Sequence, residues 1–404
     1  MRVAYAETIY GKEEVKAVMD VLKNPHHIVA GPQVKEFEKK VAALFGKKHG
    51  VMVNSGSSAN LIGLSVLDLP KGSEVITPAL TFSTTLAPIL QTGLTPIFVD
   101  VELGTYLVNP KTVESLITSR TSALMIPSLL GNIPDLKALR QLADKHSLRL
   151  FEDSCDTLGS RFDGKPTGTF SDVSTTSFYA SHIITAAGGG GMACFNDPVL
   201  AERALVMSYW GRRSTLFGAY EKSEEIQKRF AGLLQGEAYD AKFIFSEVGY
   251  NFQPTELMGA FGLAQLKRLK NVAARRKKNF KALLAFFKNY EDVFVLPKAH
   301  PDADPNWLAF PLMLKESAPF DRLALARYLE ERNIQTRPIF TGNVLRQPAF
   351  AYLGKDRVAR FPATDTIMRR GLLIGCHHGL TDRHLQYLQD TFAEFLGKRE
   401  VTKT

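Results

Sequence analysis

The stretch VNSGSSAN (53–60) combines small polar residues with the start of a helical pattern, directly after an apolar run. The free backbone N–H groups at a helix N-terminus, together with the positive end of the helix dipole, attract anions. Small side chains let an anion come close to those groups. Gly56, Ser57 and Ser58 are therefore candidates for a phosphate cradle, although an ordinary helix N-cap has the same composition.

Two more candidates follow apolar runs. LRLFEDSCD places Glu152 and Asp153 at the end of one run, where a carboxylate could hold a pyridine nitrogen protonated or simply cap a helix. SFYASHIITAAGGGG (177–191) places His182 where the apolar pattern gives way to a glycine-rich turn. Each signal is weak alone. Because ligands of parallel sheets gather at the carboxyl ends of strands, the three signals together predict one shared site.

The elements that must position these residues alternate along the chain. Short apolar runs predict strands, and amphipathic stretches such as 58–69 and 134–147 predict helices between several of them. This alternation predicts an α/β fold with a mostly parallel sheet flanked by helices. The predicted strands are GVMVN (50–54), EVITPAL (74–80), TPIFVDVE (95–102), SALMIPSLLG (122–131), LRLFED (148–153), VSTTSFY (173–179) and GMACFND (191–197).

A smaller second domain is indicated by the last third of the chain. There a long basic helix leads into a strand pattern at 306–314 and a helical pattern at 321–333. We therefore predict a large domain over residues 1–265 and a small C-terminal α+β domain over residues 266–404.

Composition narrows the function classes. The 404 residues are 45% hydrophobic and 23% charged. No apolar run approaches the roughly 20 residues of a membrane span, and no signal-peptide pattern occurs at the start. We therefore expect a cytoplasmic protein with no membrane partner. Cys155, Cys194 and Cys376 are too widely spaced to indicate a disulfide framework or a zinc site. The net charge of +9 comes from scattered basic residues, which argues against nucleic acid and suits a small polyanion such as a nucleotide diphosphate.

Over nearly its whole length the sequence resembles the DegT/DnrJ/EryC1/StrS sugar aminotransferases, which are fold-type I enzymes that use pyridoxal 5'-phosphate. GSSAN resembles the family's phosphate-binding turn, and TFSTT (81–85) carries Phe82 where an aromatic ring stacks on the cofactor. EDSCDTLGSRFDGKPTGTFSD (152–172) resembles the segment with the pyridinium-binding aspartate. The resemblance implies cofactor-binding roles for Gly56, Ser57, Ser58, Phe82, Asp153, Asp156, Ser177 and Asn251.

These implied roles differ in kind. The resemblance gives Asp153 the pyridine nitrogen, Asp156 the phenolic oxygen and Ser177 the phosphate. Asn251, in GYN (249–251), falls where an asparagine of the partner subunit completes the phosphate site. The resemblance therefore also implies a homodimer with a shared active site, and a fold-type I aminotransferase-like large domain that binds the cofactor.

The family's lysine position is occupied by His182, and no lysine lies between Lys165 and Lys222. An imidazole cannot form the covalent link that a lysine makes with the cofactor aldehyde. The histidine resembles the nucleotide-sugar 3-dehydratase branch, which uses pyridoxamine 5'-phosphate, and RPIFTGN (337–343) and GLLIGCHHGL (371–380) resemble that branch too. The resemblance implies removal of the C3 hydroxyl from a nucleotide-linked 4-keto-6-deoxyhexose, with His182 as the base, since neutral imidazole accepts protons near pH 7.

One arm of that branch carries a two-iron cluster on four cysteines. With Cys155 as the first ligand, the other three positions fall on Arg213, Thr215 and Ser223. Such clusters require four ligands, so we expect no iron–sulfur cluster and no other metal, although YDAKFIFSEVGYN (239–251) resembles the iron-containing arm. The other arm regenerates the cofactor amine by transamination, which makes glutamate the expected amino donor.

Two alternatives remain open at this point. One is an unusual sugar aminotransferase in which His182 transfers protons, and the other is a catalytically inactive, cofactor-binding regulatory protein. The complete set of cofactor-binding residues favours catalysis. Candidates for substrate contact are Arg337, Asn343, His377 and His378, although the adjacent histidines are equally compatible with the end of a strand.

Overall fold

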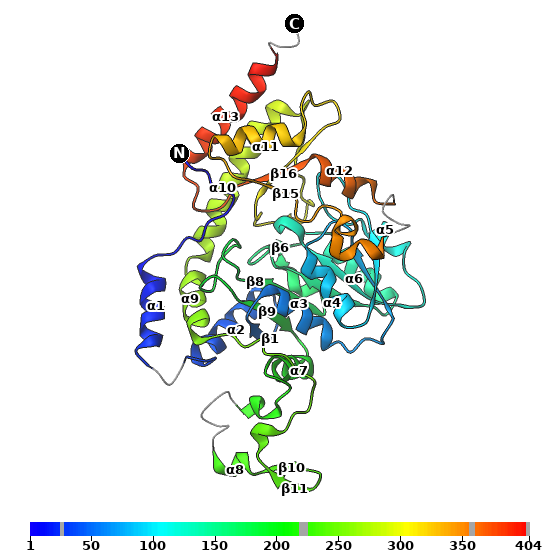
Figure 1. The fold of residues 1–404 in the computed structure, drawn as a ribbon, viewed down its shortest axis with the longest axis vertical. Coiled ribbons are helices and arrows are strands. Elements are labelled where there is room, and N and C mark those ends of the chain that lie inside the picture. Colours follow the sequence, from blue (N-terminus) through cyan, green and yellow to red (C-terminus); the bar gives the residue numbers. More distant parts are fainter. Residues whose placement is uncertain (25–27, 218–224, 355–359, 401–404) are drawn as a thin grey trace.

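A seven-stranded sheet forms the centre of the protein (Figure 1). The computed structural model describes residues 1–24, 28–217, 225–354 and 360–400. Only β9 runs antiparallel to its neighbours in this sheet, and every strand overlaps one of the segments predicted as strands. The predicted α/β class is therefore confirmed. In spatial order the strands are β1 (His49–Val53), β9 (Gly191–Phe195), β8 (Val173–Ser177), β5 (Arg149–Asp153), β4 (Thr121–Pro127), β2 (Glu74–Pro78) and β3 (Thr95–Val99).

Helices cover the sheet, which explains why strands such as β2, β8 and β9 are buried at every position instead of alternating between buried and exposed ones. Side chains in the preceding loops cap these helices: Ser55 accepts the N–H of Ser58, and Asp135 accepts the N–H of Ala138. The helices associated with the large part of the protein are α1 (Lys12–Leu22), α2 (Pro32–Leu44), α3 (Gly56–Ser65), α4 (Ser83–Gln91), α5 (Pro110–Glu114), α6 (Leu136–Lys145), α7 (Pro198–Ser208) and α9 (Glu256–Leu266).

The C-terminal part is α+β, as predicted from its sequence pattern. Its four-stranded antiparallel sheet has the order β12 (Phe294–Val295), β14 (Phe310–Leu314), β16 (Gly371–Ile374) and β15 (Thr336–Pro338). The helices are α10 (Leu269–Phe287), α11 (Arg322–Glu331), α12 (Pro362–Arg370) and α13 (Asp382–Glu400). Val3, near the N-terminus, pairs with Ile334, so the first residues join this part, and the boundary at residue 265 stays a prediction.

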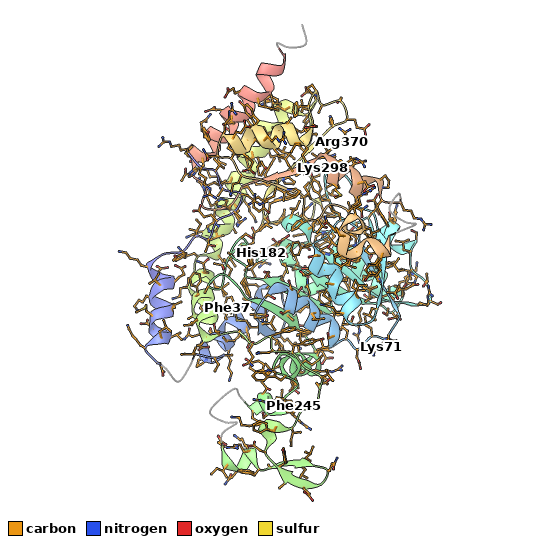
Figure 2. The ribbon with its side chains drawn as sticks, in the orientation of Figure 1. Phe37, Lys71, His182, Phe245, Lys298 and Arg370 are labelled. Atoms are coloured by element: carbon orange, nitrogen blue, oxygen red, sulfur yellow. The ribbon has the colours of Figure 1, made fainter. Side chains whose placement is uncertain are left out.

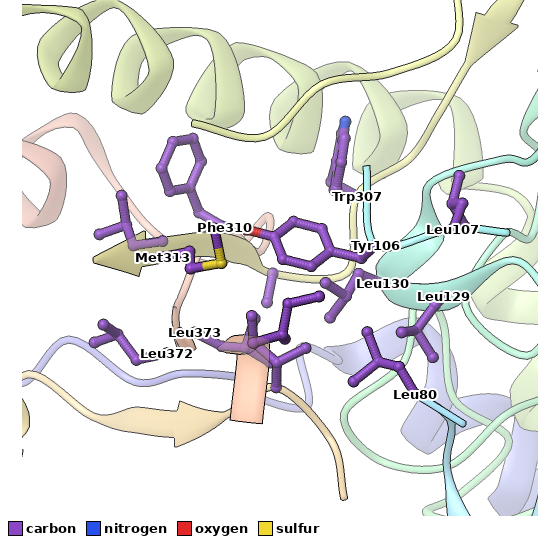
Figure 3. Packing of buried hydrophobic residues seen from close by; sticks show 14 of the residues in the cluster. Leu80, Tyr106, Leu107, Leu129, Leu130, Trp307, Phe310, Met313, Leu372 and Leu373 are labelled. Carbon is purple, nitrogen blue, oxygen red and sulfur yellow. The ribbon is translucent and has the colours of Figure 1, made fainter. Parts of the chain in front are cut away.

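The two parts share one hydrophobic core, which Figure 3 shows at close range. Residues that follow strands of the large sheet pack there against residues of β14 and β16 and the loop before β14. Because the contact is continuous and buried, the C-terminal part is held firmly over the large sheet. The labelled members of this core are Leu80, Tyr106, Leu107, Leu129, Leu130, Trp307, Phe310, Met313, Leu372 and Leu373.

Two surfaces that the sequence analysis did not anticipate expose apolar side chains. A projecting arm, residues 225–248, contains α8 (Ile226–Arg229) and the hairpin strands β10 (Gly232–Leu234) and β11 (Glu237–Tyr239), and extends below the body in Figure 1. In this arm Leu233 is 67% exposed and Val248 is 92% exposed. The outer face of α1 exposes Val15, Met19 and Leu22.

Three further short strands, β6 (Arg161–Phe162), β7 (Lys165–Pro166) and β13 (Ala303–Asp304), form a small sheet beside the main one. No helix within the described ranges has the length and apolar character needed to cross a membrane.

Candidate active site

A cavity of about 540 Å³ lies at the carboxyl ends of the parallel strands, beneath the C-terminal part. Figure 2 labels His182 at this junction between the two parts of the protein. The cavity brings together candidates that the sequence places far apart, which agrees with the expectation of one shared site at the strand ends. The predicted site residues that line it are Gly56, Ser57, Phe82, Asp153, Asp156, Ser177, His182 and Arg337.

The N-terminus of α3 and the end of β8 lie against each other where the anion cradle is predicted. A Cβ atom added to Gly56 would lie 2.6 Å from the Cβ of Ser177, so only glycine lets these two segments approach so closely. Ser57 is exposed to the cavity, and its hydroxyl donates to Oγ1 of Thr84 at 3.0 Å. The positive end of the α3 dipole lies at this edge of the cavity, where it attracts an anion.

Ser58 does not line the cavity, contrary to its predicted role. Its hydroxyl donates to Oδ1 of Asn54 at 2.7 Å, and its N–H donates to the hydroxyl of Ser55 at 3.1 Å. These bonds tie Ser58 to Ser55, the N-cap of α3, and to the loop before the helix. Ser58 therefore supports the cradle from behind.

Asp153, the last residue of β5, is a buried carboxylate held by two side chains from different helices. Its Oδ2 atom accepts hydrogen bonds from Nδ2 of Asn60 at 2.9 Å and from Oγ1 of Thr85 at 2.7 Å. Its Oδ1 atom accepts the N–H of Cys155, at 3.3 Å. Since a carboxylate can accept about four hydrogen bonds, Asp153 keeps acceptor capacity for a protonated ring nitrogen in the cavity.

His182 lies in a compact loop between β8 and β9. The loop folds back on itself, because Oγ1 of Thr185 donates to the carbonyl of Phe178 at 2.8 Å. Gly188 and Gly190, with φ of +93° and +99°, make the tight return that other residues rarely adopt. The Nδ1 atom of His182 lies 3.3 Å from Oδ1 of Asp156, a charge-pairing distance without hydrogen-bond alignment. This places a base and a carboxylate side by side in the cavity wall.

An aromatic ring and a thiol complete the lower part of the cavity. Phe82 caps α4, is 49% exposed and lies edge-on to Phe340, with ring centroids 6.1 Å apart. Burial, with Asp153 nearby, raises the pKa of Cys155 well above its ordinary range, so this cysteine is a neutral thiol. The exposed ring of Phe82 offers a flat surface on which a cofactor ring could stack.

Two of the predicted substrate contacts have structural roles instead. Asn343 is fully buried, donates to Oδ1 of Asp365 at 2.9 Å and caps the following turn by accepting the N–H of Leu345. His377 is also buried, and both of its ring nitrogens are used by backbone groups of Ala4 and Gly379. Neither residue lines the cavity, because their polar atoms already have partners in the protein.

Of the remaining predicted site residues, one lines the cavity and two do not. Arg337 lines the cavity, with its guanidinium 5.7 Å from the ring centroid of Tyr5. His378 follows β16 but is absent from the cavity lining. Asn251 is exposed at the base of the projecting arm, where Gln253 donates to its side chain at 3.2 Å, and it also lies outside the cavity. Its predicted contact with a partner's cofactor is not tested by a single chain.

Several cavity residues were missed by the sequence analysis. Tyr5 arrives from the N-terminus, and burial raises the pKa of its hydroxyl. Asn60 and Thr85 stand inside the two motifs GSSAN and TFSTT, so their polar character within otherwise apolar helices was the available signal. Further lining residues that were not predicted are Ser55, Thr84, Ser128, Leu129, Tyr179, Ser181, Leu308, Pro338, Phe340, Thr341 and Leu373.

These features fit a phosphorylated pyridine cofactor: a cradle that one methyl group would fill, a carboxylate with spare acceptor capacity and an exposed aromatic ring, all in one cavity. A mostly parallel sheet that presents this set at its strand ends defines the fold-type I class of pyridoxal-phosphate enzymes. The chain belongs to the DegT/DnrJ/EryC1/StrS aminotransferase family, whose model matches residues 8–393.

Curated relatives include proteins with different names. The chain is 39% identical to the lipopolysaccharide biosynthesis protein RfbH of Salmonella typhimurium, covering 89% of this chain and 84% of the relative. It is 38% identical to the dTDP-4-dehydro-2,6-dideoxy-D-glucose 3-dehydratase of Saccharopolyspora spinosa, covering 92% and 82%. It is also 29% identical to the GDP-perosamine synthase of Escherichia coli O157:H7, covering 97% of each chain.

Solved structures show the same fold. The E. coli GDP-4-keto-6-deoxy-D-mannose-3-dehydratase with bound hydrated PLP superimposes with a TM-score of 0.85 at 28% identity, covering 97% of this chain and 100% of that one. A GDP-4-keto-6-deoxymannose-3-dehydratase with a trapped PLP-glutamate geminal diamine gives a TM-score of 0.83 at 27% identity, covering 96% and 99%. The family and these relatives identify a PLP-dependent, sugar-modifying enzyme.

Proposed function

We propose that this protein is a 3-dehydratase that removes the C3 hydroxyl of a nucleotide-linked 4-keto-6-deoxyhexose and gives a 4-keto-3,6-dideoxy sugar. The observation that carries the proposal is the cavity lining: it contains His182 and, among the residues that the structure describes, no lysine. A family member without a lysine beside its cofactor cannot hold the aldehyde form covalently there, so the free amine form suits this site.

Each of these cavity residues has its own role in the proposed reaction. The N-terminus of α3 and Ser177 bind the cofactor phosphate, Asp153 keeps the ring nitrogen protonated, and Phe82 supports the ring face. Pyridoxamine phosphate, when bound, supplies an amine for the sugar ketone and a ring that withdraws electrons. With cofactor and sugar bound, the imidazole of His182 would accept the proton whose removal lets the sugar lose its C3 hydroxyl. Asp156, 3.3 Å from the imidazole, stabilises the resulting imidazolium.

Glutamate is the proposed amino donor. The full reaction then balances as sugar ketone plus glutamate giving dideoxy sugar, 2-oxoglutarate and ammonia. The PLP-glutamate adduct in a related dehydratase supports this donor. The proposal also holds that no iron–sulfur cluster takes part: Cys155 lines the cavity, Arg213 and Thr215 replace two of the other three ligands, and Ser223 lies outside the described residues. Within those residues, no cluster of three or more metal-ligating side chains occurs.

A borohydride experiment tests the proposal. Wild-type protein loaded with pyridoxal phosphate should lose all cofactor on denaturation after borohydride treatment, whereas His182→Lys should retain it covalently, because the new amine reaches the aldehyde. In the same experiment, glutamate should convert the wild-type cofactor to its amine form. Covalent retention by the wild type would mean that a lysine elsewhere has the family's usual role. The alternative, supported by the GDP-perosamine synthase relative, is amino transfer to the sugar.

We further propose a homodimer in which each subunit completes the other's site. The exposed apolar residues of α1 and the projecting arm support a second copy as the partner, since Asn251 follows directly after that arm. Mixing inactive His182→Asn subunits with inactive Asn251→Ala subunits should restore roughly a quarter of the wild-type activity, because one site of each mixed dimer keeps both residues. Failure to restore activity in verified mixed dimers would contradict the shared site.

A further inference from the structure

Arg276, in α10, is a fully buried arginine that binds backbone carbonyls. Its Nη1 atom donates to the carbonyls of Trp307 at 3.2 Å and Leu308 at 3.1 Å, and its Nη2 atom donates to the carbonyl of His182 at 3.3 Å. Only 1% of Arg276 is exposed, and no carboxylate forms an ion pair with it in the described part of the chain. A buried cation without a paired anion is costly, so these carbonyls are what hold it in place.

The contacts continue from Arg276 to the side chain of the same histidine. The N–H of Leu308 donates to the carbonyl of Leu130 at 2.7 Å. The N–H of Leu130 donates to Oδ2 of Asp156 at 3.0 Å, and Oδ1 of Asp156 lies 3.3 Å from the imidazole of His182. The chain of contacts therefore closes on itself, with Arg276 at the His182 backbone and Asp156 at the His182 ring.

The segments in this circuit are tightly fixed. Leu130 adopts a φ of +62°, which is unusual for a leucine, and a Cβ on Gly131 would lie 2.9 Å from the carbonyl oxygens of both Asn306 and Asp156. Trp307 stacks on Phe280 of α10 with ring centroids 4.6 Å apart. Figure 3 shows Leu130 and Trp307 within the same packed core. Because these segments are packed together and cannot move independently, a displacement at Arg276 also displaces His182 and Asp156.

We infer that Arg276 is a positioning residue for His182, holding its backbone directly and its carboxylate partner through Leu308 and Leu130. This inference rests on the proposed role of His182 as the base. It gives α10, an element of the C-terminal part, a function in the chemistry beyond packing. Small displacements of a base relative to the proton that it removes lower the rate strongly, while ground-state binding of the sugar depends on other groups.

The neighbouring Arg275 provides a matched control. It lies on the same helix, donates to the carbonyl of Leu380 through Nε at 3.1 Å and Nη2 at 2.7 Å, and pairs with Asp382 at 2.8 Å. It does not line the cavity. Removing either arginine deprives α10 of hydrogen bonds to the backbone, but only Arg276 contacts His182.

The test uses Arg276→Lys, Arg276→Met and Arg275→Met in the full-length protein, each with and without His182→Asn. We expect Arg276→Met to lower kcat by about 10-fold or more with KM changed less than about threefold, and Arg276→Lys to recover part of the loss. In the His182→Asn background the same substitution should cause no further loss. Equal losses in both backgrounds, or an equal loss from Arg275→Met, would overturn the inference.

Hydrogen exchange in the cofactor-free protein gives a second readout that needs no activity. Arg276→Met should raise the exchange rate of residues 178–186 above the wild-type rate. Arg275→Met should leave that rate unchanged. Unchanged exchange in that loop would overturn the inference. If Arg276→Met does not fold, the same comparisons with Arg276→Lys decide. If the wild type dehydrates no sugar, the proposed function fails, while the exchange comparison still decides whether Arg276 positions the loop.

Discussion

The Nδ1 atom of His182 lies 3.3 Å from Oδ1 of Asp156. The two residues come from loops that follow different parallel strands, β8 and β5. The two loops are far apart in the sequence, and they lie side by side because β5 and β8 are neighbours in the sheet. The imidazole thus has a carboxyl group directly beside it in the cavity wall.

Replacing His182 by asparagine should separate proton transfer from cofactor binding. His182→Asn should lower the dehydration rate by about 100-fold or more, the range that loss of a general base costs, because the amide cannot accept the proton. Cofactor affinity, measured by fluorescence titration, should stay close to the wild-type value, since other residues hold phosphate, ring nitrogen and ring face. Retention of most activity would remove His182 from the mechanism.

Thr85 should affect cofactor affinity by holding the carboxylate of Asp153 in place. Thr85→Val removes the 2.7 Å hydrogen bond to Oδ2 and frees the carboxylate to rotate, so cofactor affinity should fall by about 10-fold, as expected for one hydrogen bond to a charged group. Thr92→Val, at the far end of α4, is the control, because its hydroxyl bonds only the carbonyls of Pro88 and Ile89. Equal losses in both variants would indicate a general effect on α4.

Gly56 should be irreplaceable in the phosphate cradle. In Gly56→Ala the added methyl would lie 2.6 Å from the Cβ of Ser177, so the helix must move away and the cofactor Kd should rise at least about 10-fold. Gly189→Ala is the matched control, because its added Cβ would meet the nearest atoms at an ordinary 3.5 Å. Equal binding of phosphate-bearing cofactor by Gly56→Ala and the wild type would contradict the assigned cradle.

His377 should make the fold sensitive to acid. Burial, with a smaller contribution from Arg276, lowers its pKa from 6.5 to about 4. Between these pH values the unfolded chain binds a proton that the folded chain does not, so stability decreases as pH falls through this window, by about 1.4 kcal/mol per pH unit for one such group. His377→Gln should flatten the pH dependence of the free energy of unfolding over this range. An unchanged slope would show that other groups cause it.

Much of this architecture could be predicted because most strands are buried on both faces and appear as short apolar runs, with β8, VSTTS, the polar exception. The site was predictable where a motif follows a strand, as for Gly56, Asp153 and His182. Asn343 and His377 were misplaced because sequence order does not show that Asp365 and Ala4 take up their polar atoms. Tyr5 and Arg276 were missed because their contacts join segments far apart in the chain, and no local pattern records such contacts.

Mass analysis of the reaction product tests the central claim most directly. The protein, pyridoxal phosphate and glutamate should be incubated with a panel of nucleotide-linked 4-keto-6-deoxyhexoses. The account predicts, for at least one of them, a product that is lighter than the substrate by one oxygen atom, formed together with 2-oxoglutarate and ammonia. A product that carries an amino group at C4 instead would show that the enzyme is an aminotransferase and would contradict the account.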